Sequence, residues 1–383
     1  MRPYGLLLLM LIASGCGGAR DDQAIHEEMP RLSLTPLAQI CVGGDEVPCQ
    51  FVNAALATVA PDGRVAVADI FGELREFGRD GQFVRTVGAR GGGPGEYRRL
   101  VAAGYDGLGR LTVLDQSAMR VQRFDGTGTV DGTATAPFIP GLIGVSVVHG
   151  KVALFSLPGA SAIGDTVEAH LVLVDPASGD TSSLPGLPEP AIATGDGSMF
   201  PIPPLFTVMP IERWAVSPDG AFHLADRERL RIVRRDRAGG TPVVLVDLAV
   251  APRPVTDQDI EAALARRGPI GPPGNTVVAA QLRRQLDAAR ENAPRVHPLV
   301  TRLVILDDGT LLARGSAPPG IDSVRWNVFS AEGDPVGYLL LSAGTSIAAG
   351  RLERMLLTIP DADDVPRIGW YGVRSEAEAG AGR

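Results

Sequence analysis

Few residues of the sequence have the types and spacing that catalytic chemistry requires. The sequence contains no Gly-x-Ser-x-Gly, His-Glu-x-x-His, EF-hand or Cys-x-x-Cys motif, so it lacks the signatures of common hydrolases, metalloproteases, calcium loops and dithiol centres. The five histidines are scattered, and His223 stands in an alternating stretch that favours a packed or solvated strand residue. Asp361, Asp363 and Asp364 could hold calcium, but a solvated loop is the simpler interpretation.

A glycine-rich stretch, GARGGGPGEYRRL from Gly88 to Leu100, has the composition of a phosphate-binding loop. Such a loop ends in Gly-Lys-Ser/Thr, whereas this run ends in Pro94, Gly95 and Glu96. Proline removes an N–H donor, and a carboxylate repels phosphate. We therefore interpret the stretch as a tight structural link whose glycines supply positive φ angles, with Glu96 accepting hydrogen bonds from its N–H groups.

Acidic and basic residues recur at matching places in a repeated phrase. The phrase occurs at 61–81, 100–125 and 217–239, and its period-two alternation between glycines and aspartates predicts antiparallel strands. An aspartate ends the second strand of each unit, and an arginine begins or enters the third. These pairs are Asp69 and Arg75, Asp115 and Arg120, and Asp226 and Arg231. They could line an anion site, but their recurrence favours a structural role in which a salt bridge and Asx-type capping hold the turn.

A repeat of about 40–50 residues with several short strands is typical of β-propellers. The succession of glycines, a buried strand, D-x-G-x-L-x-V-x-D, a turn and R-I-x-x-F resembles the NHL-type repeat of six-bladed β-propellers. Residues 88–128 match it nearly throughout, with Tyr97 at the usual phenylalanine. The resemblance extends over 51–130, 210–240 and, more weakly, 300–373. It implies an all-β, six-bladed β-propeller and says little about activity, because such propellers include binding proteins, lactonases, lyases and scaffolds.

The chain divides into six units and one insertion. We place the units at 51–88, 99–138, 141–187, 204–250, 295–340 and 341–373. The sixth is one strand short, and residues 31–41 can supply that strand and close the ring. Between units four and five, residues 256–293 predict a short two-helix insertion, which opens with a capping box of Thr256 and Asp259. The tryptophans, Trp214, Trp326 and Trp370, are expected in the blade core.

The N-terminus indicates export. Residues 1–15 read as a signal peptide, with an apolar run from Leu6 to Ile12 that is too short to span a bilayer. The residues before Cys16 resemble a bacterial lipobox, with Ala13 where leucine is usual. This resemblance implies a lipoprotein with a diacylated Cys16, and Gly17 then implies an outer-membrane lipoprotein facing the periplasm or the cell surface. The alternative is an ordinary signal peptide with an incidental cysteine.

The regions that follow complete the domain plan. Residues 16–31 are expected to form a flexible tether, 32–374 the propeller and 375–383 a disordered tail. Cys41 and Cys49 flank a loop with two glycines and a proline, and we predict that they form a disulfide in an oxidising compartment. A zinc site is disfavoured because no Cys-x-x-Cys or nearby histidine completes four ligands.

Two function classes remain. The net charge of −8 disfavours a nucleic-acid surface. A non-catalytic module that binds a peptide, glycan or partner protein, without cofactor or metal, is favoured. The alternative is a hydrolase or lyase resembling the lactonase and amidating-lyase propellers, whose tunnel metal is held by innermost-strand side chains. The strands expected there, LATVA, LVAAGYD, GVSVV, RWAVS and LVILD, are almost wholly apolar.

The ligand is expected on the face that carries the insertion. The turns between second and third strands and the links between blades emerge on that face, because antiparallel strands reverse at each turn. The candidate binding face therefore comprises Glu96, Asp69, Arg75, Asp115, Arg120, Asp226 and Arg231.

Overall fold

The computed structural model describes residues 25–40, 51, 54–69, 73–139, 142–156, 166–190, 210–236, 240–266, 283–284, 287, 290–291, 293–317, 321–363 and 365–375. The predicted signal peptide, Cys16, Cys41, Cys49 and residues 376–383 lie outside these ranges. Lipidation, the disulfide and the disordered tail therefore stay predictions.

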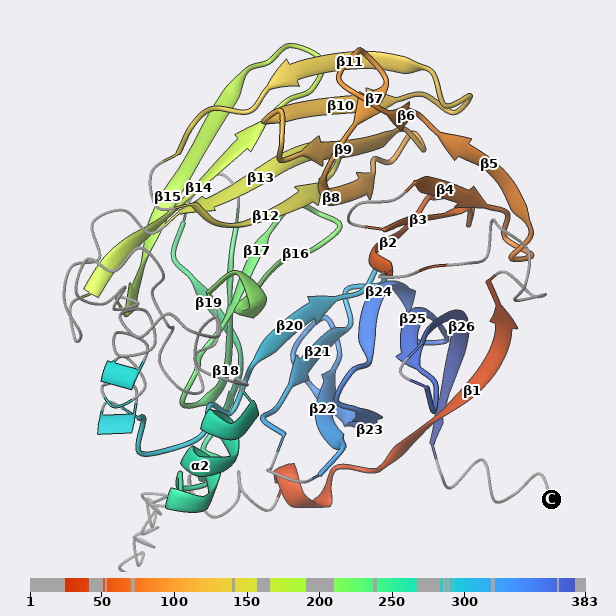
Figure 1. The fold of residues 1–383 in the computed structure, drawn as a ribbon. Helices are drawn as coiled ribbons and strands as arrows, with labels where there is room; N and C mark the ends of the chain where they lie inside the picture. The colour runs from red at the N-terminus through yellow and green to blue at the C-terminus, as the bar shows by residue number, and fades with distance from the viewer. Residues whose placement is uncertain are drawn as a thin grey trace, which may run out of the picture.

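Six four-stranded antiparallel sheets surround a central axis as the blades of a propeller (Figure 1). The first blade contains β2 (Ala54–Val59), β3 (Val65–Asp69), β4 (Leu74–Phe77) and β5 (Phe83–Val87), and the second contains β8 (Leu100–Tyr105), β9 (Leu111–Asp115), β10 (Arg120–Phe124) and β11 (Val130–Thr135). The third blade contains β12 (Leu142–Val148), β13 (Lys151–Ser156), β14 (Thr166–Val174) and β15 (Thr181–Pro190), and the fourth contains β16 (Trp214–Val216), β17 (Phe222–Ala225), β18 (Leu230–Arg235) and β19 (Val243–Leu248). The fifth blade contains β20 (Arg302–Ile305), β21 (Leu311–Arg314), β22 (Ser323–Phe329) and β23 (Pro335–Ser342). The predicted all-β, six-bladed fold is confirmed.

The sixth blade joins the two ends of the described chain. It contains β24 (Ser346–Arg351), β25 (Arg354–Pro360), β26 (Pro366–Ser375) and β1 (Leu32–Gln39). β1 pairs antiparallel with β26, from Leu32 opposite Ser375 to Gln39 opposite Gly369. The N-terminal strand thus completes the last blade, as predicted, and closes the ring.

The innermost strands are β2, β8, β12, β16, β20 and β24. Chain reversal places the turns after these strands on one face, which we name the inner-turn face: residues 60–64, 106–110, 149–150, 217–221, 306–310 and 352–353. The links between blades emerge on the opposite face, which we name the link face.

The core consists of six apolar clusters, each shared by two neighbouring blades in the described structure. The blade faces are apolar because the alternating side chains of inner strands point to a neighbour on either side. Trp214, Trp326 and Trp370 are all buried in these clusters, as predicted.

The glycine-rich link connects β5 to β8 through a short parallel pair, β6 (Ala89–Arg90) and β7 (Glu96–Tyr97). Gly88 and Gly95 have φ angles of 68° and 77°, which favour glycine. Glu96 Oε2 accepts a hydrogen bond of 2.7 Å from the N–H of Gly93. The buried Tyr97 hydroxyl donates to the carbonyl of Val87, 2.9 Å away. These contacts confirm the structural interpretation of the stretch.

The predicted tether, residues 16–31, ends too late, because residues 25–31 pack on the propeller. Residues 25–28 are helical, and Met29 is 5% exposed in the cluster between the fourth and fifth blades. The carbonyl of Pro30 accepts from the N–H of Tyr338 at 2.9 Å, and Arg325 Nη2 donates to the carbonyl of His26 at 2.7 Å. The assignment of 25–31 to a flexible tether was wrong, because a single buried methionine and backbone hydrogen bonds hold a segment of polar composition.

The insertion begins with α2 (Asp257–Arg266), which follows β19 and precedes β20 in the chain. Residues 283–284, 287 and 290–291 are also helical. Thr256 N donates to Asp259 Oδ2 at 2.9 Å, and Asp259 N donates to Thr256 Oγ1 at 3.2 Å, so the predicted capping box is present. Within the described part of the chain, no helix has the length and apolar character needed to span a membrane.

Candidate functional site

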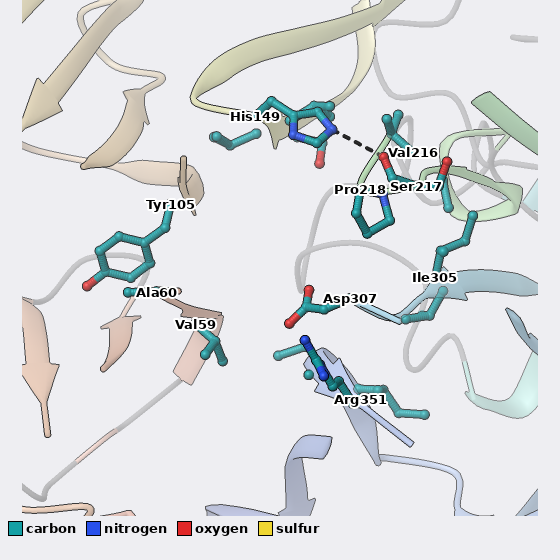
Figure 2. A pocket seen from close by; sticks show the side chains of 18 of the residues that line it. Val59, Ala60, Tyr105, His149, Val216, Ser217, Pro218, Ile305, Asp307 and Arg351 are labelled. Carbon is teal, nitrogen blue, oxygen red and sulfur yellow. Dashed lines mark hydrogen bonds between the residues drawn. The ribbon is translucent and has the colours of Figure 1, made fainter. Parts of the chain in front are cut away.

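A cavity of about 1160 Å³ occupies the centre of the ring. Its wall comes from the innermost strands of all six blades, and the view in Figure 2 looks into it. Aliphatic side chains form much of this wall: Val59, Val145, Val147, Val216, Ile305 and Ile347. The cavity exceeds the usual range of small-molecule sites, so it has room for a compact ligand or a chain end.

The mouth of the cavity lies on the inner-turn face. Every blade contributes residues there, which include Asp62, Asp106, His149, Ser217, Asp307 and Arg351. Figure 2 shows Asp307 and Arg351 on one side of the cavity, and His149 with Ser217 on another. The polar groups of the mouth therefore lie in turns and at strand ends, and the aliphatic surface lies on strands.

Two carboxylates of the mouth are occupied by their own turns. Asp62 accepts from the N–H of Arg64 at 3.1 Å and from its Nε at 2.8 Å. Asp106 accepts from the N–H groups of Leu108 and Arg110, both at 2.9 Å, and from Arg110 Nε at 2.7 Å. Burial raises the pKa of each carboxyl, but these hydrogen bonds and the adjacent guanidinium outweigh it, and both pKa values are lowered.

Asp307 differs from these two carboxylates. Its N–H donates to the carbonyl of Gly350 at 2.7 Å, which joins the turn of the fifth blade to β24 of the sixth. Its pKa is raised, first by desolvation at the mouth and second by the neighbouring Asp308, while Arg351 opposes the shift. No ion pair of the described residues includes the Asp307 carboxylate, so it remains available to the cavity.

Three arginines gather where the sixth blade meets the first. Arg351 ends β24, Arg354 begins β25, and Arg79 lies in the turn between β4 and β5, where its side chain passes over Gly63. Arg354 Nη2 donates to the carbonyl of Arg79 at 3.3 Å. Its guanidinium carbon lies 4.6 Å from the ring centroid of the buried Trp370. Desolvation, followed by the positive charge of Arg79, lowers the pKa of Arg354.

His149 adopts a backbone conformation that is rare for residues other than glycine. Val148 pairs with Lys151, so His149 and Gly150 form a two-residue hairpin turn, with φ angles of 48° and 75°. His149 Nε2 lies 3.1 Å from the carbonyl oxygen of Ser217 in the fourth blade. Because a carbonyl only accepts, Nε2 carries the proton, and Nδ1 is the acceptor of the neutral ring. Sequence reasoning missed this residue, although a His-Gly pair between two alternating runs signals such a turn.

The described side chains of the predicted binding face lie outside the cavity lining. Three of them meet in the second blade: Arg120 Nη1 and Nη2 donate to the carbonyls of Gly92 and Glu96, while Asp115 accepts from the N–H groups of Arg98 and Arg99, both at 3.1 Å. These contacts fasten the glycine-rich link to its blade.

The predicted salt bridges within the turns are wrong for two of the three pairs. Asp115 caps Ser117 N at 3.0 Å, and Asp226 caps Glu228 N at 2.8 Å, so the Asx capping is present. Their arginines point elsewhere, Arg120 to carbonyls and Arg231 to Asp247 at 3.7 Å. Backbone N–H groups are the nearest donors to a carboxylate at the start of a turn, so they are bonded in place of the guanidinium.

The remaining members of the predicted binding face are Arg75 and Asp69 of the first blade. Arg75 is buried, pairs with Glu73 at 3.3 Å and lies over the ring of Phe51. The side chain of Asp69 is not among the described ones. That this face binds the ligand stays a prediction.

A second charged cluster lies under α2, away from the cavity lining. The buried Asp259 accepts from Arg253 Nη1 at 2.9 Å. Its Oδ2 is 3.1 Å from Nε2 of the buried His297. Burial raises the pKa of Asp259, but hydrogen bonds from Thr256, His297 and Arg253 outweigh it and lower the pKa. The cluster fixes the first turn of α2 to the propeller.

Catalytic constellations are scarce in the described structure. No group of three or more histidine, cysteine, aspartate or glutamate side chains within the described ranges has the geometry of a metal site. His223, at 2% exposed, is a packed strand residue as predicted. Asp361 caps the N–H groups of Asp363 and Val365, each at 3.0 Å, as a loop carboxylate does.

Comparisons with known proteins bear on the fold alone. No protein-family model matches the sequence, and no curated protein matches it. A solved structure from the DUF4221 family of Bacteroides vulgatus is 8% identical, covers 91% of this chain and 100% of its own, and has a TM-score of 0.55. A protein of Bacteroides fragilis whose name suggests export is 12% identical, covers 90% of this chain and 95% of its own, and has a TM-score of 0.53.

More distant propellers include enzymes. A gluconolactonase of Xanthomonas campestris is 11% identical, covers 90% of this chain and 97% of its own, and has a TM-score of 0.44. A likeness this low does not bear on activity. The two Bacteroides structures, with TM-scores above 0.5, show that this chain shares their fold.

Proposed function

We propose that the protein is an exported, membrane-anchored β-propeller that binds a ligand in its central cavity and does not transform it. The observation that carries this proposal is the cavity itself, whose aliphatic wall ends in a mouth with uncommitted charged groups. Such a site combines apolar burial with a few polar contacts that fix orientation, which is what binding requires.

The role of the mouth residues supports binding over catalysis. A catalytic site needs a nucleophile or base held by a second group that orients it. At this mouth, Asp62 and Asp106 are hydrogen-bonded to their own turns, and His149 donates to a carbonyl. These side chains stabilise the rim, and the remaining arginines and Asp307 recognise charge.

The anchor follows from the N-terminal sequence. Diacylation of Cys16 attaches the chain to a membrane, and residues 16–24 then connect the lipid to the segment that packs on the propeller. A tether of this length is shorter than the one predicted from sequence, so the propeller stays close to the membrane surface. We place it at the outer membrane, facing the periplasm or the cell surface, where it binds a peptide, a glycan or a partner protein.

A cavity-filling variant tests the binding role. Ser146 lies in the cavity wall, on β12, and Ser146→Trp fills the space beside it. The full chain is purified from the exporting cell, and native mass spectrometry measures the ligand that it retains. We expect Ser146→Trp to lose this ligand and the matched control, Ala177→Trp in an exposed turn of the same blade, to keep it.

Two results would count against the proposal. Equal retention by Ser146→Trp and wild type would place binding elsewhere, and deletion of 256–293 then tests the link face. Stoichiometric, tightly bound calcium or zinc in the purified protein would favour the hydrolase or lyase alternative.

A further inference from the structure

The mouth of the cavity has one more positive charge than negative among its unpaired groups. Arg79, Arg351 and Arg354 all line the cavity, as do Asp307 and Glu353. None of these five takes part in an ion pair of the described structure. Three cations therefore face two carboxylates, and one positive charge is left for a ligand.

The arginines lie close enough to act together. Arg354 is hydrogen-bonded to the backbone of Arg79, and the charge of Arg79 disfavours the charged form of Arg354. Two like charges held side by side bind an anion between them, because the anion removes their repulsion and supplies acceptors for their N–H groups. The guanidinium of Arg354 lies over the ring of Trp370. Trp370 is 3% exposed, and its Nε1 lacks a hydrogen-bond acceptor. This side of the mouth thus has more donors than acceptors.

The charge count favours a monoanion. A phosphate or other dianion would meet the two carboxylates of Asp307 and Glu353 with excess negative charge. A carboxylate supplies a single charge and the planar pair of oxygens that a guanidinium binds. Below the mouth, the side chains of Val59, Ile305 and Ile347 offer apolar surface. At the opposite end of the cavity, Glu212 and Arg302 add one charge of each sign and leave the net count unchanged.

We propose that the cavity binds an apolar molecule or chain end that terminates in one carboxylate, with the carboxylate at Arg79, Arg351 and Arg354 and the apolar part inside the ring. This inference rests on the proposed function and names its ligand class. An apolar peptide with a free C-terminus and an alkyl carboxylate share this chemistry.

Matched probes separate charge from shape. N-acetyl-trivaline is compared with its C-terminal amide, and hexanoate with hexan-1-ol, by calorimetry on the full-length protein at low ionic strength. We expect each acid to bind about tenfold more tightly than its neutral partner, as a charge-assisted hydrogen bond provides. A preference confined to the peptide pair identifies a peptide end, and one confined to hexanoate identifies an alkyl carboxylate; either supports the shared chemistry.

Substitutions of charged residues test whether the arginines cause the preference for the acid over the neutral probe. Arg79→Gln with Arg351→Gln should abolish the preference for acid, while Arg90→Gln, which removes an exposed charge on β6 outside the cavity, should keep it. Asp307→Asn, which leaves all three arginines in place, should tighten acid binding several-fold because it removes an opposing charge.

The opposite results would overturn the inference. These are equal affinity for acid and neutral probe, an equal loss in Arg90→Gln, or weaker acid binding by Asp307→Asn. If neither acid binds more tightly than its neutral partner while Ser146→Trp still loses the retained ligand, the proposed ligand class is wrong and the binding role stands.

Discussion

The hydroxyl of Tyr105 donates a hydrogen bond of 2.6 Å to Glu76 Oε1 and thereby joins the innermost strand of the second blade to the third strand of the first. Glu76 is 1% exposed and also meets Arg64 Nη1 and Arg85 Nη2, each at 2.6 Å. Burial and the adjacent carboxylate raise the pKa of Tyr105, so the phenol stays protonated and keeps donating. A buried charge with partners from two blades makes this interface specific in register.

Loss of this hydrogen bond is expected to weaken the interface. Tyr105→Phe should lower the free energy of unfolding by about 1–3 kcal/mol, the usual contribution of a hydrogen bond to a charged group. Glu76→Gln should cost more, about 3–5 kcal/mol, because it leaves the guanidinium of Arg85 without its anion and that of Arg64 with Asp62 alone. Urea titration measures both. Tyr371→Phe, a half-buried tyrosine of β26, is the control, and equal loss there would contradict the assignment.

Stability should fall in mild acid because of His223. Burial, followed by the charge of Arg234, lowers the pKa of His223 to about 4, while Asp219 and Asp236 oppose the shift. Between the unfolded pKa of 6.5 and about 4, the unfolded chain binds the proton more readily, so stability decreases as pH falls through this window. The loss approaches about 3 kcal/mol at the lower end.

A pair of histidine variants isolates this effect. His223→Gln should reduce the slope of unfolding free energy against pH between 6.5 and 4.5 by about half, because His26, whose pKa burial and Arg325 also lower to about 4, keeps its own contribution. His170→Gln, which removes an exposed histidine of β14, should leave the wild-type slope. A slope unchanged by His223→Gln would assign the acid sensitivity to other groups.

Met29 is expected to hold the N-terminal segment on the propeller. Met29→Ala should cost about 2–3 kcal/mol, because it leaves a cavity in the cluster between the fourth and fifth blades. It should also expose residues 25–31 to proteases, as timed digestion and mass spectrometry would detect. Ile25→Ala, at a side chain 41% exposed, should do neither. A segment equally resistant in Met29→Ala would mean that its backbone contacts suffice.

The lipid anchor can be tested independently of the propeller. If Cys16 is diacylated as proposed, Cys16→Ser should move the protein from the detergent phase to the aqueous phase on phase separation, because the variant lacks the proposed attachment to the membrane. Folding, monitored by circular dichroism, should not change. Persistent partition into detergent would refute lipidation at this residue.

The architecture was predictable from local signals. Period-two alternation and the Asp-Gly turns of each repeat depend on neighbouring residues alone, so strands such as β3 and β9 could be placed from sequence. Even the pairing of β1 with β26 followed from counting strands, since the sixth unit lacked one.

The site was less predictable because it depends on contacts between distant residues. Arg79 and Arg354 come from the first and sixth blades, and no spacing rule links them. Asp62 and Asp106 belong to short Asp-Gly turns, and the sequence around each turn carries no sign that the two lie near one another. Only the ring arrangement brings six such turns around one opening. Met29 was missed for the same reason, since its pocket is built by residues of β17, β18 and β21.

The pairing of Leu32 with Ser375 determines when the ring can close during synthesis of the chain. A chain emerges from the ribosome, or from a translocation pore, with its N-terminus first. β1 is therefore among the first strands to appear and the last to find its partner, because β26 follows only after five blades have been delivered. Until then, β1 presents an unpaired edge that can recruit other chains. Ring closure therefore requires the complete chain. In a chain truncated before β26, the edge of β1 stays unpaired, and quality-control proteases can recognise the truncated chain by this edge.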